Sequence, residues 1–215
     1  MLSISVGVYD LFSYTIPGIL YFFVTNEIVK AFGLPYLKYS DVSDATAIAL
    51  VIIVSFVLGH VMDFVADKWK DLGENKKVSI LAIEGLKRNY PDLDIKFQPN
   101  ERAVLFAVIR RNDEDITATI DRNKAISILF QNLSLGLFLY AIFQLSGMFA
   151  FGFSSVNFAL LIGSIILSLV IRKRGRMFNL WFNSLIFEVA LTYGTSTREI
   201  LKNAKLRKVK DNSRD

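Results

Sequence analysis

One stretch of this chain constrains its fold more than any other feature: 47 consecutive residues between Lys124 and Arg172 contain no Asp, Glu, Lys or Arg. A helix crosses the ~30 Å hydrocarbon layer of a bilayer with about 20 residues, so this stretch is long enough to cross twice. Glycines near its middle suit a short turn over residues 149–153. The stretch therefore predicts a transmembrane hairpin within residues 125–171.

Two further apolar runs lie in residues 1–66 and predict a first hairpin, with spans at about 11–30 and 44–65. The earlier run contains Pro17-Gly18, which membrane helices tolerate when neighbouring groups satisfy the freed carbonyl. Hydrophobic residues make up 53% of the 215 residues, more than a soluble chain of this size has interior to bury. The sequence thus predicts an all-α integral membrane protein with four transmembrane helices.

The distribution of basic residues predicts the orientation in the membrane. Of 25 Lys and Arg residues, 12 lie in residues 67–124 and 11 follow Ile171, which leaves only Lys30 and Lys38 elsewhere. Basic residues that flank spans are retained on the cytoplasmic side. We therefore expect a multi-pass protein of the bacterial inner membrane, with both termini and the 67–124 loop in the cytoplasm.

The two cytoplasmic segments are predicted to be helical. The 67–124 loop has helix-like apolar spacing that is interrupted before Pro91, and at 58 residues it is marginal for an independent core, so it should lean on the membrane helices. The basic tail, residues 172–215, contains an apolar segment at about 177–191. This segment is too short in its uncharged part for a fifth span, and we expect an interfacial helix with Trp181 at headgroup level, or packing against the loop.

A basic cluster follows the last predicted span and is formed by Arg172, Lys173, Arg174 and Arg176. Each basic residue near anionic headgroups contributes about 1 kcal/mol, so the lipid bilayer is the expected partner, with a protein partner as the alternative. Nucleic acid is a further candidate for the basic tail. No aromatic residue follows Tyr193, however, so bases would find no stacking platform.

One constellation of titratable residues stands out: His60, Asp63 and Asp67 share roughly one helical face at the cytoplasmic end of the second span. Such a face suits cation binding or proton transfer, or simple pairing of polar groups. The chain has no cysteine, no phosphate-binding glycine loop and no nucleophile motif. We therefore predict no catalytic residue, no metal site and no cofactor.

Polar side chains inside the second predicted hairpin form another candidate group: Gln131, Asn132, Gln144 and Asn157. Lipid cannot hydrogen-bond to them, so they should face other helices or water. Two interpretations stay open. They form interhelical hydrogen bonds, or they line a pore in an oligomer.

The first quarter of the chain carries a short motif, Tyr9-Asp10 followed by Tyr14 and Pro17-Gly18, and the second span ends in Gly59-His60 with Asp63 three residues later. This pattern resembles small multi-span bacterial inner-membrane proteins, some of which are encoded beside anti-phage defence systems. The resemblance implies a membrane subunit that responds to a cytoplasmic signal or partner during infection by oligomerising and perturbing the membrane.

Our leading hypothesis is therefore a homo-oligomeric membrane effector or sensor that receives a cytoplasmic signal or protein partner through the 67–124 loop and the tail. A small transporter or lipid-modifying enzyme centred on His60, Asp63 and Asp67 is the alternative. A membrane tether for a cytoplasmic partner is the third hypothesis.

Overall fold

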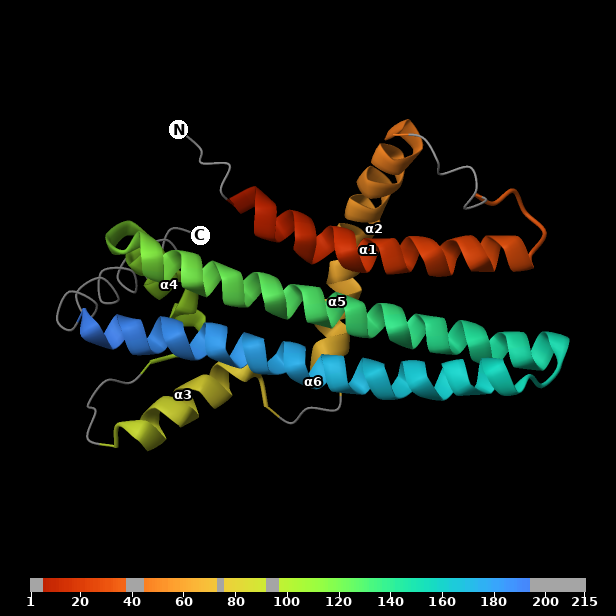
Figure 1. The fold of residues 1–215 in the computed structure, drawn as a ribbon. Helices are drawn as coiled ribbons and strands as arrows, with labels where there is room; N and C mark the ends of the chain where they lie inside the picture. The colour runs from red at the N-terminus through yellow and green to blue at the C-terminus, as the bar shows by residue number, and fades with distance from the viewer. Residues whose placement is uncertain (1–5, 38–44, 73–75, 92–96, 194–215) are drawn as a thin grey trace, which may run out of the picture. The chain divides into compact units, whose positions relative to one another are not determined.

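A computed structural model describes residues 6–37, 45–72, 76–91 and 97–193, and all regular elements in these ranges are helices (Figure 1). In chain order they are α1 (Val6–Ala31), α2 (Ala45–Asp71), α3 (Val78–Asn89), the 3₁₀ helix η2 (Pro99–Glu101), α4 (Arg102–Asn112), α5 (Glu114–Phe151) and α6 (Ser155–Thr192). Gly152, with a φ of 92°, lies in the short turn between α5 and α6.

Three of these helices, α2, α5 and α6, are long and apolar enough to cross a membrane. The prediction of an all-helical, membrane-embedded protein is confirmed to that extent. The fourth predicted span corresponds to α1, which is not among the three.

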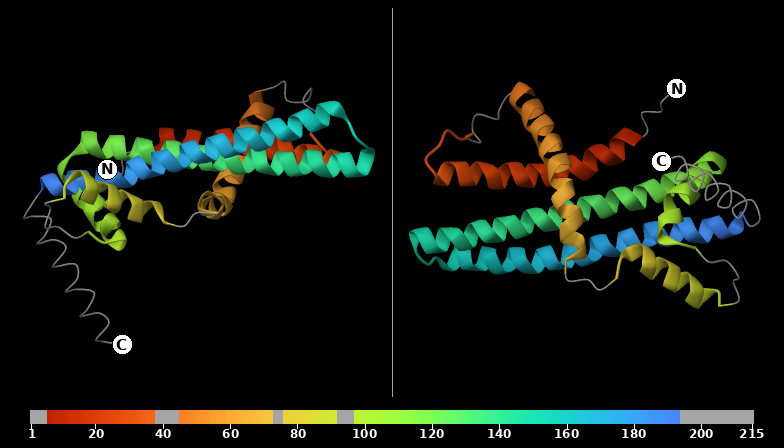
Figure 2. Two further views of the ribbon diagram at one scale, coloured as in Figure 1. Left: turned by 90° about the horizontal axis from the view of Figure 1, so that it is seen from below. Right: turned by 180° about the vertical axis from the view of Figure 1, so that it is seen from behind.

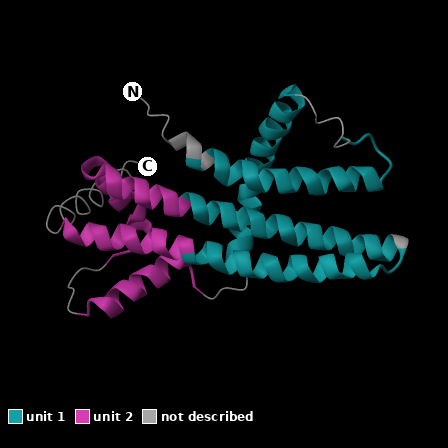
Figure 3. Ribbon diagram, viewed as in Figure 1, with its two compact units in different colours: residues 1–73, 125–177 teal, residues 74–124, 178–215 magenta. Residues whose placement is uncertain are grey.

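The chain divides into two compact units (Figure 3). Unit 1 comprises Met1–Gly73 and Ala125–Met177, and unit 2 comprises Glu74–Lys124 and Phe178–Asp215. The predicted boundary at 124 coincides with a boundary of these units, whereas those at 66 and 171 both lie within unit 1. Helix α2 continues to Asp71, and α6 continues past residue 171 without a break. Helices α5 and α6 each contribute residues to both units.

Within unit 1, α5 is the central helix. In the most apolar 18-residue segment of α5, 39% is buried inside the protein. The corresponding share is 11% for α2 and 17% for α6. Helices α5 and α6 run side by side in every view, and α2 crosses α1 steeply (Figures 1 and 2). At that crossing Gly18 of α1 faces the backbone of Ser55, and Gly59 of α2 faces the backbone of Tyr14. Small residues four apart let helices in membranes approach this closely.

Unit 2 has a conventional apolar core formed by α3, α4, the first part of α5 and the last part of α6. Its fully buried side chains include Leu105, Ile109, Ile120, Ile186 and Phe187. Helix α3 ends at Asn89, next to Tyr90 and Pro91, because a proline disfavours helical geometry in the residue before it.

The segment at 177–191, for which we predicted an interfacial helix or packing on the loop, is the C-terminal part of α6. From residue 178 onward it belongs to unit 2. There its apolar face, with Phe182, Ile186 and Phe187, packs into the core of that unit. Trp181 lies on the other side, is 44% exposed and meets the ring of Phe178 edge-on at 4.9 Å.

Candidate functional site

A buried polar contact joins three helices of unit 1. The Tyr21 hydroxyl of α1 donates a hydrogen bond to the backbone carbonyl of Asn132 on α5 (2.7 Å), and the Asn132 side-chain amide donates to Asp63 Oδ1 on α2 (2.9 Å). Asn132 is fully buried. In a dry interior such bonds fix the helices to one another, since breaking them leaves polar groups with no solvent to bind.

A second polar contact joins α2, α5 and α6. Trp69 Nε1 donates to Ser134 Oγ (2.9 Å), and the hydroxyls of Ser134 and Ser168 each donate to the other residue's carbonyl oxygen (2.9 and 2.7 Å). The Trp69 ring stacks on Phe138 with centroids 4.4 Å apart. These bonds hold α5 and α6 at a distance that only small side chains permit.

Arg172 is placed differently from the rest of the basic cluster. Its guanidinium lies 4.9 Å from the centre of the Trp69 ring and donates to the carbonyl oxygens of Lys70 (3.5 Å) and Leu72. It therefore caps the C-terminal end of α2, where carbonyls lack partners and the helix dipole is negative. Lys173 and Arg174 are exposed and Arg176 is partly buried.

Gln131 lies one turn from Ser127 on α5 and donates to its hydroxyl (2.6 Å), while Ser127 in turn donates to the carbonyl of Gly175 on α6 (3.0 Å). Asn132 therefore bonds directly to another helix, whereas Gln131 is linked to α6 only through Ser127. These contacts within one chain favour the interhelical interpretation for Asn132.

The structure does not gather His60, Asp63 and Asp67 into one site. His60 is exposed and contacts the rings of Tyr14 (4.7 Å) and Phe56 (6.3 Å). Asp63 accepts from Asn132, and Asp67 pairs with Lys70. In the described ranges no three His, Cys, Asp or Glu residues are grouped so that they could hold a metal ion. Each of the three residues has a separate structural partner.

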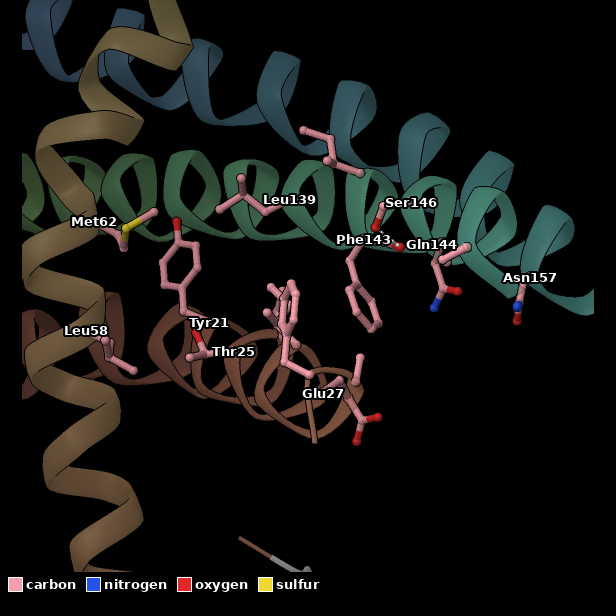
Figure 4. A pocket seen from close by; sticks show the side chains of 17 residues that line it. Tyr21, Thr25, Glu27, Leu58, Met62, Leu139, Phe143, Gln144, Ser146 and Asn157 are labelled. Carbon is pink, nitrogen blue, oxygen red and sulfur yellow. Dashed lines mark hydrogen bonds between the residues drawn. The ribbon is translucent and has the colours of Figure 1, made fainter. Parts of the chain in front are cut away.

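Gln144 and Asn157 line a pocket of about 740 Å³ within unit 1, between α1, α2, α5 and α6 (Figure 4). Its wall is mostly apolar and includes Leu58, Met62 and Phe143. Such a volume is typical of sites for small molecules, which combine an apolar wall with a few polar groups. Of the four polar residues predicted as one group, Asn132 bonds to α1 and α2, Gln131 bonds within α5, and Gln144 and Asn157 line this pocket.

Several residues that organise unit 1 were missed by the sequence analysis, above all Tyr21 and Trp69. Both lie in apolar surroundings, where a hydroxyl or an indole N–H needs a partner, and this is the signal that could have identified them. Asn26 was also missed: it bonds both the N–H and the carbonyl of Leu37 at 2.9 Å and so fixes the chain after α1.

The described part of the chain thus offers buried hydrogen bonds between helices and an apolar pocket, and the polar groups in these places suit structural pairing and ligand binding. Comparison of the chain with protein-family models, with curated proteins and with solved structures finds no match.

Proposed function

We propose that this protein is a signal-receiving effector of the bacterial inner membrane, in which unit 2 receives a cytoplasmic signal or protein partner and the spans of unit 1 respond. The observation that carries the proposal is that α5 and α6 each contribute to both units. Two unbroken helix backbones therefore connect the receiving unit to the membrane spans.

The chemistry of the two units supports this division of roles. Unit 2 buries an apolar core beneath charged helices, as a domain in water does, while unit 1 exposes apolar side chains along α2 and α6. The excess of basic residues in and around unit 2 supports a cytoplasmic location through the retention of positive charge on that side. The proposed topology has four spans, with α1 as the first and both termini in the cytoplasm.

Support for α1 as a span comes from its two faces. Tyr21 and Val24 are buried in unit 1, while Ile16, Ile19 and Phe23 are exposed, as expected of side chains that face lipid. Helix assembly and a role in anti-phage defence are carried over from the motif resemblance in the first quarter of the chain. The transporter or enzyme alternative loses support because His60, Asp63 and Asp67 have separate partners.

Topology is tested first, in a chain that has no native cysteine. Single cysteines at Leu34, Phe153 and Arg88, all at exposed positions, are treated in intact cells with a membrane-impermeant maleimide. We expect labelling at Leu34 and Phe153 and none at Arg88 until the membrane is opened. Labelling of Arg88 in intact cells would place unit 2 outside and overturn the proposal.

The proposed effector function is tested by the mass of the full chain in mild detergent and by dye release from liposomes that contain it. A defined homo-oligomer that releases dye, or a stoichiometric cytoplasmic partner that co-purifies and alters release, supports the proposal. A monomer that leaves the liposomes sealed and brings no partner would overturn it.

The surface that receives the signal is then located with two matched charge reversals. Arg110→Glu/Arg111→Glu changes the exposed end of α4, and Lys87→Glu/Arg88→Glu changes the exposed end of α3. The variant that loses the response to the partner identifies the helix that receives it.

A further inference from the structure

The pocket in unit 1 has a polar end and an apolar end. Tyr21, Leu58 and Met62 lie at one end, and Gln144 and Asn157 lie toward the other (Figure 4). Along α5 its lining runs from Leu139 to Ala150, which at 1.5 Å per residue is about 16 Å. That length is close to half of the ~30 Å hydrocarbon layer, the thickness of one leaflet.

Gln144 brings a side-chain amide to the wall of this pocket. Its side chain is buried, with 9% of the residue surface exposed, yet within the described ranges neither its side-chain amide nor that of Asn157 makes a hydrogen bond. The Asn157 side chain is half-buried. A polar group that is shielded from solvent and lacks a hydrogen-bond partner destabilises the folded protein. The amide of Gln144, with that of Asn157 beside it on the pocket wall, therefore suits a hydrogen-bonding group that enters from outside.

The carboxylate of Glu27 at the polar end of the pocket distinguishes between a fatty acid and a phospholipid as the bound molecule. Glu27 lines the pocket and its carboxylate lies 3.6 Å from the Lys30 ammonium, which is half-exposed. A carboxylate head group would be brought close to Glu27 and repelled. A neutral ester carbonyl would not be repelled, and Lys30 is available to a phosphate nearer the membrane surface.

We propose that this pocket holds one acyl chain of a membrane phospholipid, with the amides of Gln144 and Asn157 donating hydrogen bonds to its ester carbonyls. The acyl chain lies along Leu139 and Phe143 toward Leu58 and Met62, and the head group lies beyond Glu27 at the membrane surface. The bilayer supplies this ligand wherever the protein resides, so the inference rests on membrane embedding and is independent of the signalling role.

The pocket can be filled by a single substitution. Gly147 lines it, and a Cβ built there meets no atom within 4 Å. Gly147→Leu should therefore occupy the space of the acyl chain without disturbing the helices. Gly163 on α6 is the matched control, because its Cβ is equally unobstructed and it lies outside the pocket.

The experiment is native mass spectrometry of the full chain in mild detergent with palmitoyl-oleoyl phosphatidylethanolamine as the probe. We expect one bound phospholipid per chain for the wild type and for Gly163→Leu, and about tenfold weaker retention for Gly147→Leu, as overpacking of a filled site implies. Equal retention by Gly147→Leu and the wild type would overturn the proposal, as would a wild type that retains no lipid. Oleate bound in place of the phospholipid would overturn the choice of occupant.

The hydrogen bonds are tested separately with Gln144→Met, which keeps the length of the side chain and removes its amide. We expect the wild type to bind the ester-linked lipid about three- to tenfold more tightly than its ether-linked analogue, and Gln144→Met to bind both equally. A wild type that does not distinguish ester from ether would overturn the role of the amides. This comparison does not depend on the folding of Gly147→Leu.

Discussion

The two units of this protein differ in the side chains that they bury and in those that they expose. Of the fourteen buried polar residues in the described ranges, eleven lie in unit 1, and the remaining three are Glu101, Thr117 and Asn183. Nearly all exposed large apolar side chains also lie in unit 1, the exceptions being Ile80, Tyr90 and Trp181. This contrast is the one expected of a chain with one unit in lipid and the other in water.

The same physical rules produce both arrangements. In water the apolar side chains of unit 2 leave the solvent and form its core, with about 25 cal/mol gained per Å² buried. In lipid that driving force between helices is absent, so close packing and hydrogen bonds hold the spans together. Asn132, Ser134 and Ser168 provide these bonds in unit 1.

The largest expected effect comes from placing a charge in the water-type core. Ile186→Asp puts a carboxylate at a fully buried position, and we expect it to destabilise unit 2 by about 4 kcal/mol or more. Limited proteolysis of the full chain should then cut within unit 2. The control is Glu188→Gln, at an exposed position of the same helix, with an expected change within about 0.5 kcal/mol. A wild-type digestion pattern for Ile186→Asp would contradict the described core.

A charge on the lipid-type surface gives the next largest effect. Ile166→Asp changes a residue of α6 that is 58% exposed, and a charged residue at the centre of a span costs about 2.5–3.5 kcal/mol. Ile80→Asp, at an exposed apolar position of unit 2, should cost only about 0.5 kcal/mol. The fraction of full-length protein inserted into membranes measures both. Equal fractions for the two variants would mean that both positions face the same solvent.

Two glycine substitutions should have opposite signs. Gly59→Ala places a Cβ against the backbone of Tyr14 at the α1–α2 crossing, with an expected loss of about 1–3 kcal/mol. Gly163→Ala meets no atom within 4 Å and should stabilise α6 by about 0.5–1 kcal/mol through its helix propensity. Unfolding of the full chain in mixed micelles of mild detergent and dodecyl sulfate measures both. A stabilising Gly59→Ala would show that α1 and α2 do not cross closely there.

The smallest effect concerns the bond between Asp63 and Asn132. A double-mutant cycle of Asp63→Ala and Asn132→Ala should give a coupling free energy of about 0.6 kcal/mol, the average for hydrogen bonds between membrane helices. The matched cycle of Asp63→Ala with Gln144→Ala should be additive within about 0.3–0.5 kcal/mol, because these residues share no partner. Unfolding in the same mixed micelles reports both cycles. Coupling in the second cycle but not in the first would contradict the described contact.

Much of the fold can be predicted from the sequence, because a run of apolar residues and a proline each determine the structure of the segment in which they lie. The uncharged run between Lys124 and Arg172 requires apolar helices of membrane length, and these are parts of α5 and α6. Pro91 accounts for the end of α3. The segment at 177–191 was harder to place, since its apolar face suits a membrane interface and a protein core equally well, and only the core in unit 2 distinguishes them.

The candidate site was less accessible to prediction. Sequence identified Asn132, Gln144 and His60 as polar residues in apolar surroundings, but it assigned Gln144 and Asn132 to one group and His60 to a cluster with two aspartates. Asn132 bonds to a residue 69 positions earlier in the chain, and Gln144 lines a pocket formed by four helices. Neither relation is encoded in local spacing.

The sequence by itself determined that this protein is helical, that it contains helices of membrane length and that its basic residues concentrate in two segments, because these properties depend on composition over short windows. Tertiary structure alone decided which faces of those helices meet. A helix that is apolar on every side has no preferred face, so its rotation is set by its neighbours. The reciprocal approach of Gly18 and Gly59, the partners of Asn132 and the unpartnered amide of Gln144 all follow from that choice.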